Sequence, residues 1–183
     1  MSRLQSQPRL ALVRECLPTA KCVALIKHTA NPALNLQVDA SNAAASELAL
    51  KVLVLEFAAA DEIEQAFEAA AAQRVDAVLP LSDPMALGNA ERIGALSLRY
   101  KIPVVSPFRE ITDVGGLLSY GPDLSMLFRR SASLVDQILK GAKPGALPIG
   151  KPSDFELSVN LQAAKALNVT IPPSILSRAT YVR

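Results

Sequence analysis

The chain has 183 residues, of which 50% are hydrophobic and 20% are charged. This length fits one domain, or one domain with a small appendage, and the apolar content argues against disorder. The 19 basic and 17 acidic residues give a net charge of +2 and are scattered, so nucleic acid is not indicated as a partner. No apolar run reaches about 18 residues, which argues against membrane insertion.

Side chains that commonly carry catalysis or bind metals are scarce. Two cysteines, Cys16 and Cys22, and a single histidine, His28, argue against cysteine–histidine, serine–histidine and multi-histidine metal sites. We read the cysteines as small core residues and His28 as a strand-end side chain. No glycine-rich phosphate loop follows the first expected strand, where the sequence reads HTANP. We therefore expect no metal, no cofactor and no enzyme activity.

From the start to residue 106, expected helices alternate with expected strands. The apolar runs and their spacing predict strands over 22–26, 51–57, 75–81 and 102–106. Helices are expected over 9–17, 32–48, 61–73 and 84–100. Strands separated by helices predict an open parallel sheet with helices on both faces, in a single α/β domain. The first residues, MSRLQSQP, lack the apolar segment of a signal peptide, so the chain as written is expected to stay in the cytoplasm.

The stretch VDAVLPLSDP, residues 75–84, organises the molecule. Its near-continuous apolar run is typical of a strand buried on both faces of a parallel sheet. Ser82 and Asp83 follow, and Pro84 behind them predicts the first position of a new helix. Because open α/β sheets hold ligands beyond the carboxyl ends of their strands, we expect a ligand site at this junction.

The alternation changes after residue 106. Residues 107–116 read as a loop and 117–120 as a short strand. Asp123 is expected to cap a helix over 124–140, followed by an extended connector over 142–152. A late strand over 155–159 and a short helix over 161–167 complete the expected elements.

These segments resemble a known family. The chain resembles the substrate-binding proteins of ABC transporters in the order of four segments, which are SDP, IPVVSPFREITDVGGLLSYGPDL, ILKGAKP and LPIGKPSDFELSVNLQAAKALNVTIPPSIL. The terminal block with FELSVN, AAKALNV and IPPSIL is long and specific. The likeness points to the branch of uncharacterised periplasmic components that includes aromatic amino-acid binders. It implies the fold of a type I periplasmic binding protein, in which two α/β lobes joined by three crossing segments close on a ligand.

The resemblance covers one lobe. Residues 9–121 and 151–178 resemble the second lobe, and 122–150 resemble the crossing helix and connector that pack on the first lobe. That first lobe, with its signal sequence, would precede Arg9. Two explanations compete, a natural short paralogue and a reading frame that has lost its front half.

Each candidate ligand residue also has a plain structural explanation. Ser82 and Asp83 could bind the charged ends of a small ligand, or could serve as an ordinary helix cap. Asn31, before Pro32, has the same two interpretations. Phe108 could stack on a ligand and Arg109 could bind a carboxylate, or the two could form a partly buried ring and a surface ion pair.

Four further candidates follow the loop. Gly115, Gly116, Ser119 and Tyr120 lie where the resemblance places the hinge and the ligand cleft. The alternative is that a turn requires these glycines for its own geometry.

The expected helix over 124–140 has an apolar stripe with no obvious partner in this chain. Burial of each such side chain contributes roughly 1.5 to 3 kcal/mol, so an exposed stripe is unfavourable for a monomer. We therefore predict a homodimer, because a second copy could cover the stripe around a two-fold axis. Its interface would centre on Leu127, Phe128, Leu134, Val135 and Ile138.

Two functions remain open at this stage. The first is a non-catalytic solute-binding component of an ABC-type importer, with an amino acid-like ligand and, if exported, an ABC permease as partner. The second is a cytoplasmic effector-sensing or interaction module of the same fold. A secretion signal encoded upstream would favour the first, and a fused DNA-binding or other domain would favour the second.

Overall fold

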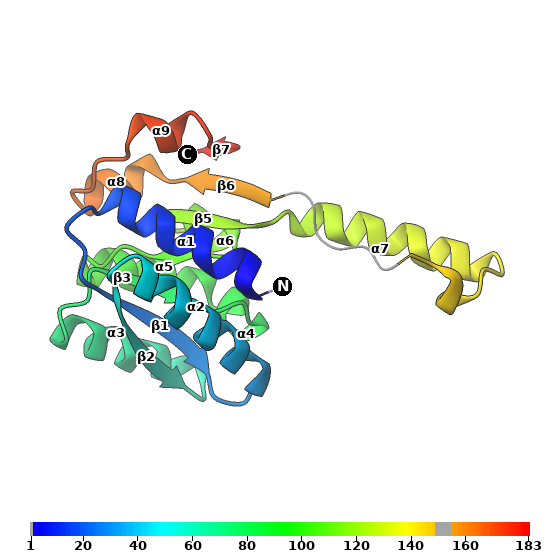
Figure 1. Ribbon diagram of the computed structural model, residues 1–183, viewed down its shortest axis with the longest axis horizontal. Coiled ribbons are helices and arrows are strands. Elements are labelled where there is room, and N and C mark those ends of the chain that lie inside the picture. Colours follow the sequence, from blue (N-terminus) through cyan, green and yellow to red (C-terminus); the bar gives the residue numbers. More distant parts are fainter. Residues whose placement is uncertain (1, 149–154) are drawn as a thin grey trace.

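The computed structural model describes residues 2–148 and 155–183, which form an α/β body with one projecting arm (Figure 1). The strands are β1 (Cys22–His28), β2 (Lys51–Phe57), β3 (Ala77–Pro80), β4 (Val105–Ser106), β5 (Leu118–Pro122), β6 (Phe155–Val159) and β7 (Tyr181–Val182). The α-helices are α1 (Ser2–Cys16), α2 (Asn35–Glu47), α3 (Ile63–Ala72), α4 (Pro84–Gly88), α5 (Ala90–Tyr100), α6 (Arg109–Asp113), α7 (Leu124–Leu139), α8 (Leu161–Ala166) and α9 (Pro173–Leu176). Three short 3₁₀ turns are η1 (Pro32–Leu34), η2 (Ala60–Glu62) and η3 (Pro144–Ala146).

The strands form two hydrogen-bonded groups, β2-β1-β3 and β4-β5-β6-β7, which a single parallel bridge between Val78 and Val104 joins. All strand pairs are parallel except β5 with β6. The antiparallel β6 departs from the parallel sheet expected from the sequence. Its direction follows from the arm, because β5 leaves the body at Pro122 and the chain re-enters at Phe155, directly opposite Pro122 in the ladder.

The ladder between β3 and β4 is interrupted at the carboxyl end of β3. Pro80 ends β3 and has no N–H group to donate to a neighbouring strand. Its carbonyl oxygen instead accepts a hydrogen bond from Nη1 of Arg9 in α1, at 3.3 Å. Burial lowers the pKa of Arg9 to about 10, so the guanidinium remains charged at neutral pH. A buried cation on α1 thus fixes the end of the central strand.

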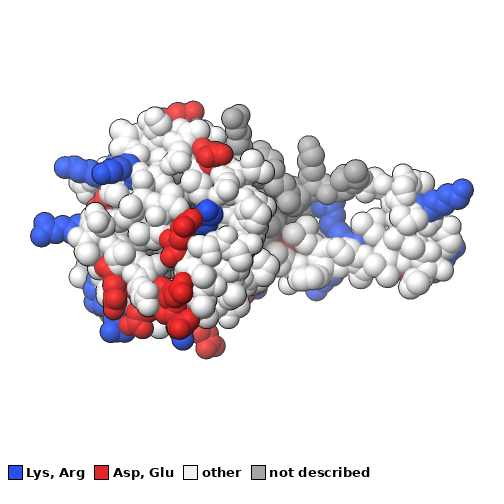
Figure 2. Space-filling model, turned by 90° about the horizontal axis from the view of Figure 1, so that it is seen from below, with Lys and Arg blue, Asp and Glu red and all other residues white. Residues whose placement is uncertain are grey.

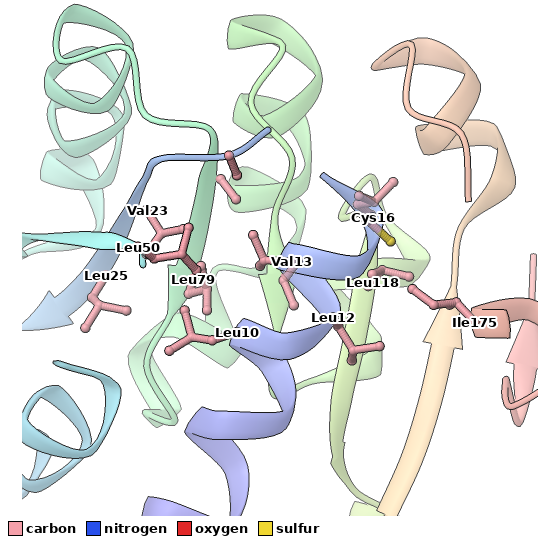
Figure 3. Close-up of a cluster of buried hydrophobic side chains, with 14 of the residues drawn as sticks. Leu10, Leu12, Val13, Cys16, Val23, Leu25, Leu50, Leu79, Leu118 and Ile175 are labelled. Carbon is pink, nitrogen blue, oxygen red and sulfur yellow. The ribbon is translucent and has the colours of Figure 1, made fainter. Parts of the chain in front are cut away.

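Each face of the sheet has its own hydrophobic core. Helices α1, α2 and α8 cover one face, where Leu10, Val13, Leu25 and Leu79 are fully or almost fully buried (Figure 3). Helices α3, α5 and α6 cover the other face. Burial on both faces explains the near-continuous apolar run in β3.

The expected helices and strands are present, with several differences in extent: α1 begins at Ser2, η1 replaces the start of the helix expected over 32–48, and β4 is shorter than the strand expected over 102–106. The helix expected over 84–100 is two helices, because Asn89 leaves helical geometry and its side chain donates to the carbonyl of Met85. The expected loop over 107–116 contains the one-turn helix α6, and the end of the chain adds α9 and β7. The connector expected over 142–152 contains η3 and extends beyond the described residues.

The arm consists of α7 and the turn that follows it. Asp123 caps α7 as expected, since its carboxylate accepts from the Met126 N–H at 3.1 Å. No residue of α7 is buried. Figure 1 shows the helix projecting away from the body instead of packing on it.

Candidate functional site

The order of the strands places the switch point of the sheet, where open α/β folds have their ligand crevice, between β1 and β3. From β1 the chain crosses through α2 to β2, while β3 lies on the other side of β1 and continues into helices on the opposite face. Open α/β sheets bind ligands at such a switch point, outside the carboxyl ends of the strands. The residues placed there are His28 at the end of β1 and Ser82–Asp83 after β3.

Asp83 connects the segments around this crevice, and its side chain is only 4% exposed. Its Oδ1 accepts from the Met85 N–H at 2.8 Å and thereby caps α4. Its Oδ2 accepts from Nδ2 of Asn31 at 2.7 Å, while Oδ1 of Asn31 caps η1 through the Ala33 N–H. The two caps expected from the sequence are therefore both present, and the structure joins them to each other.

His28 completes this group, although its sequence position suggested only a strand-end side chain. Its Nδ1 lies 3.4 Å from Oδ1 of Asp83, and its ring stacks on Phe57 with centroids 5.4 Å apart. Phe57 faces His28 in the β1–β2 register. The only sequence signal that could have placed His28 in this group was its position at the end of β1, because β1 and β2 both end at the same edge of the sheet.

The backbone of Ser82 is held from α2. Its N–H donates to Oε1 of Gln37 at 3.0 Å, and its carbonyl accepts from Nε2 of the same side chain at 3.3 Å. This double contact fixes the turn between β3 and α4. Gln37 was not recognised from the sequence, because nothing local links a glutamine in α2 to a turn 45 residues later.

Phe108 and Arg109 follow β4 but are directed elsewhere. Phe108 packs against the core under α3 and α5. The Arg109 guanidinium lies 3.7 Å from Glu156, 3.8 Å from Asp113 and over the ring of Tyr181. Arg109 is thus engaged on the β6–β7 side of the sheet, and the ion pair considered in the sequence forms with Glu156 and Asp113.

Gly115 and Gly116 lie at the amino end of β5, on the edge of the sheet away from Asp83. Gly115 has φ +130°, and a Cβ there would lie 2.6 Å from the carbonyl oxygen of Gly94 in α5. A Cβ on Gly116 would lie 2.9 Å from the carbonyl oxygen of Ile111. In this chain both glycines allow close packing of α5 and α6 against the start of β5, and the structure does not bring them to the crevice.

Ser119 and Tyr120, in β5, are also separate from the Asp83 group. Ser119 is buried in the sheet opposite Ser158 of β6. Tyr120 packs against the core under α1, and its ring stacks on Phe155 at 5.5 Å. Of the nine predicted ligand residues, the structure therefore gathers Asn31, Ser82 and Asp83 and adds His28 to them.

The predicted dimer residues lie along the arm. Phe128, Val135 and Ile138 are 74%, 53% and 40% exposed, whereas Leu127 and Leu134 are half-buried. On the face of the molecule in Figure 2, acidic and basic side chains are both distributed over the body, while the charged side chains that stand out on the arm are mostly lysine and arginine.

Within residues 2–148 and 155–183, no group of three histidine, cysteine, aspartate or glutamate side chains could hold a metal ion. Among the same residues, no helix is both long and apolar enough to cross a membrane.

The sheet order, the covering helices and the polar crevice define an α/β lobe of the periplasmic binding protein type. Solved structures agree on the fold. A conserved domain protein from Vibrio cholerae superposes with a TM-score of 0.90 at 23% identity, over 97% of this chain and 60% of that one. An ABC domain from Streptococcus pneumoniae, solved in complex with L-Trp, gives 0.87 at 24% identity, over 100% of this chain and 62% of that one.

The sequence assigns the family. Residues 2–183 match the family described as ABC transporter substrate binding protein, and the chain belongs to it. A tyrosine-binding protein from Clostridioides difficile is 22% identical over 160 residues, which are 87% of this chain and 46% of that protein. The chain thus spans about half the length of this curated relative. The family and these relatives are binding proteins by description.

Proposed function

We propose that this chain is a non-catalytic solute-binding component of an ABC-type importer that holds a small amine, such as an amino acid, beside Asp83. The observation that carries the proposal is the group of Asn31, Ser82, Asp83 and His28 at the switch point of the sheet. The family match favours this function over the effector-sensing module that the sequence left open.

The chemistry of Asp83 supports an ammonium ligand. An ionised carboxylate offers about four acceptor positions. The Met85 N–H and the Asn31 amide use two of them, and His28 approaches a third. One position remains for a charged donor, and such charge-assisted hydrogen bonds are stronger where water is excluded. The Asp83 side chain is 4% exposed, and this small exposed part is where an ammonium group would have to bind.

The relatives suggest which amines to test first. One is described as a tyrosine-binding protein, and another was solved with L-Trp. We extend this to the present chain as a proposal, with aromatic amino acids as the leading ligand class. If the chain is exported, an ABC permease is the expected partner for delivery.

We also propose that a second copy of the chain covers the apolar face of α7. Leu124, Ser131 and Ile138 are seven residues apart, and so are Leu127 and Leu134, which is the spacing of helices that pair along their length. Phe128 and Val135 flank this seam and are mostly exposed. An antiparallel pair about a two-fold axis would bury this seam on both copies at once.

Titration of the isotope-labelled chain with amino acids tests the ligand site. We expect L-Tyr or L-Trp to shift the backbone amide signals of Asn31, Ser82 and Asp83. The described residues contact the ligand from one side of the crevice, so a dissociation constant of about 1 mM is expected. A panel of all amino acids that leaves these three amides unmoved at saturating concentrations would refute the proposal.

A further inference from the structure

A second cavity lies away from the Asp83 crevice, between α1 and the β5–β6 pair. Its volume is about 330 Å³. Leu12, Tyr120, Phe155, Leu157 and Arg178 are among the residues that line it. The Asp83 group takes no part, because it lies at the ends of β1 and β3 and contributes no residue to this wall.

The floor of the cavity is aromatic. Tyr120 and Phe155 stack with centroids 5.5 Å apart and planes 12° apart, and Leu157 lies beside them. Pro8, Ala11 and Leu12 of α1 also line the cavity. A stacked aromatic pair beside aliphatic side chains accommodates a flat apolar body, since aromatic groups prefer offset stacking on one another. An apolar cavity of about 150 Å³ is enough for benzene, so this one has room for a fused bicyclic ring.

One end of the cavity carries a hydrogen-bond acceptor. The Glu15 carboxylate accepts from the Ser174 hydroxyl through Oε1 and from Arg178 through Oε2, both at 2.5 Å. The Ser174 hydrogen bond, assisted by Arg178, lowers the pKa of Glu15, so this carboxyl is ionised at neutral pH. Each oxygen of an ionised carboxylate can accept a further hydrogen bond. Glu15 and Arg178 already balance each other's charge, so the end of the cavity favours a neutral donor.

We propose that this cavity is a second small-molecule site, for a neutral planar aromatic compound with one hydrogen-bond donor, of the indole or phenol type. The ring extends the stacked pair of Tyr120 and Phe155 on the side that faces the cavity, and its N–H or O–H donates to Glu15. The site is independent of the amino-acid site proposed at Asp83, so either can fail without the other.

Indole is the probe, and the amide spectrum of the intact chain is the readout. We expect saturable shifts at Ala11, Leu157 and Thr180, with a dissociation constant of about 1 mM or lower. Benzothiophene has the same shape without the N–H donor, and it should bind at least about threefold more weakly, because it leaves Glu15 without the new hydrogen bond.

Matched variants test whether indole binds in this cavity. Ala11 is exposed on α1, so Ala11→Trp is expected to fold and to fill the cavity with its own ring, weakening indole at least tenfold. Ala43→Trp puts the same side chain at an exposed position on α2 outside this cavity, and Asp83→Ala alters only the crevice; both should leave indole binding unchanged. Absence of saturable shifts, an unchanged response in Ala11→Trp, or loss of the response in Asp83→Ala would each overturn the proposal.

Discussion

Two helices of this protein begin in the same way and end in opposite environments. Asp83 caps α4 and Asp123 caps α7, each through a carboxylate oxygen that accepts a backbone N–H two or three residues later. Around Asp83 the side chains of Asn31 and His28 converge, and the carboxylate is buried. The α7 helix that follows Asp123 projects from the body and has no buried residue.

The longer and more regular helix is therefore the one without a packing surface. Helix α4 has five residues, yet its cap lies at the switch point of the sheet and joins three segments of the chain. Helix α7 has sixteen residues and a continuous apolar stripe. A local signal such as a cap or a stripe establishes that a helix forms, while the topology decides what that helix contacts.

Matched leucine-to-alanine substitutions should show the largest difference in stability between the body and the arm. Leu25 in β1 is fully buried, and Leu139 in α7 is 81% exposed. Leu25→Ala should lower the free energy of unfolding by about 2 to 5 kcal/mol, through lost burial and the cavity left behind. Leu139→Ala should change it by less than about 0.5 kcal/mol. Urea denaturation measures both values, and a similar loss in the two variants would show that α7 packs on the body in solution.

The arm should gain its packing from a second copy. We expect light scattering to give twice the chain mass of 19.4 kDa at micromolar concentrations. Phe128→Glu puts a charge in the centre of the proposed interface and should weaken association about 100-fold, or about 2.7 kcal/mol.

Substitution on the polar side of the same helix provides the control. Ser133→Glu introduces the same charge at an exposed position outside the five predicted interface residues and should leave the mass unchanged. A wild-type monomer over the whole micromolar range would contradict the homodimer and leave the α7 surface for a different lobe or protein.

Alanine substitution of the two capping aspartates should give a smaller difference in the free energy of unfolding. Asp83→Ala removes the cap of α4 and leaves the Asn31 amide without its partner, which should lower stability by about 1 to 3 kcal/mol. It should also abolish any thermal shift produced by amino acids. Asp123→Ala removes a comparable cap from an exposed helix. It should lower the free energy of unfolding by about 0.5 to 1 kcal/mol and should retain the ligand response. If Asp83→Ala keeps the full ligand-induced shift, Asp83 is only a cap.

The sequence predicted the elements well because their signals are local. The strand at 51–57 and the caps at Asn31, Asp83 and Asp123 depend on neighbours within a few residues, and the structure has each of them. The family resemblance stated from the sequence is also confirmed.

The contacts among distant segments could not be read in the same way. His28 reaches Asp83 across 55 residues, and Gln37 reaches Ser82 across 45, so neither pairing has a local signature. The glycines at 115 and 116 were grouped with the site because the family resemblance places the hinge and the cleft there, although they precede β5 and lie at the other edge of the sheet. The reversal of β6 depends on where the arm returns, which no periodicity within β6 records.

The smallest expected effect is on the rate of cysteine labelling, which tests whether the body stays folded when association through the arm is weakened. Burial raises the pKa of the Cys16 thiol to about 12, with a further contribution from Glu15, and burial also raises the pKa of Cys22. Because thiolates are the reactive form, iodoacetamide at pH 8 should label Cys22 slowly and Cys16 hardly at all, and urea should expose both. The pKa of Cys16 in the folded protein lies above its ordinary value of 9.0, so this thiol contributes stability below about pH 9 that is lost as the pH rises toward 12. Intact-mass measurement should give the same labelling rate for the wild type and for Phe128→Glu, since Cys16 is the last residue of α1, in the core of the body, and not on the arm. Faster labelling of Cys16 in Phe128→Glu would show that the arm and the body unfold together, and would remove the distinction between them.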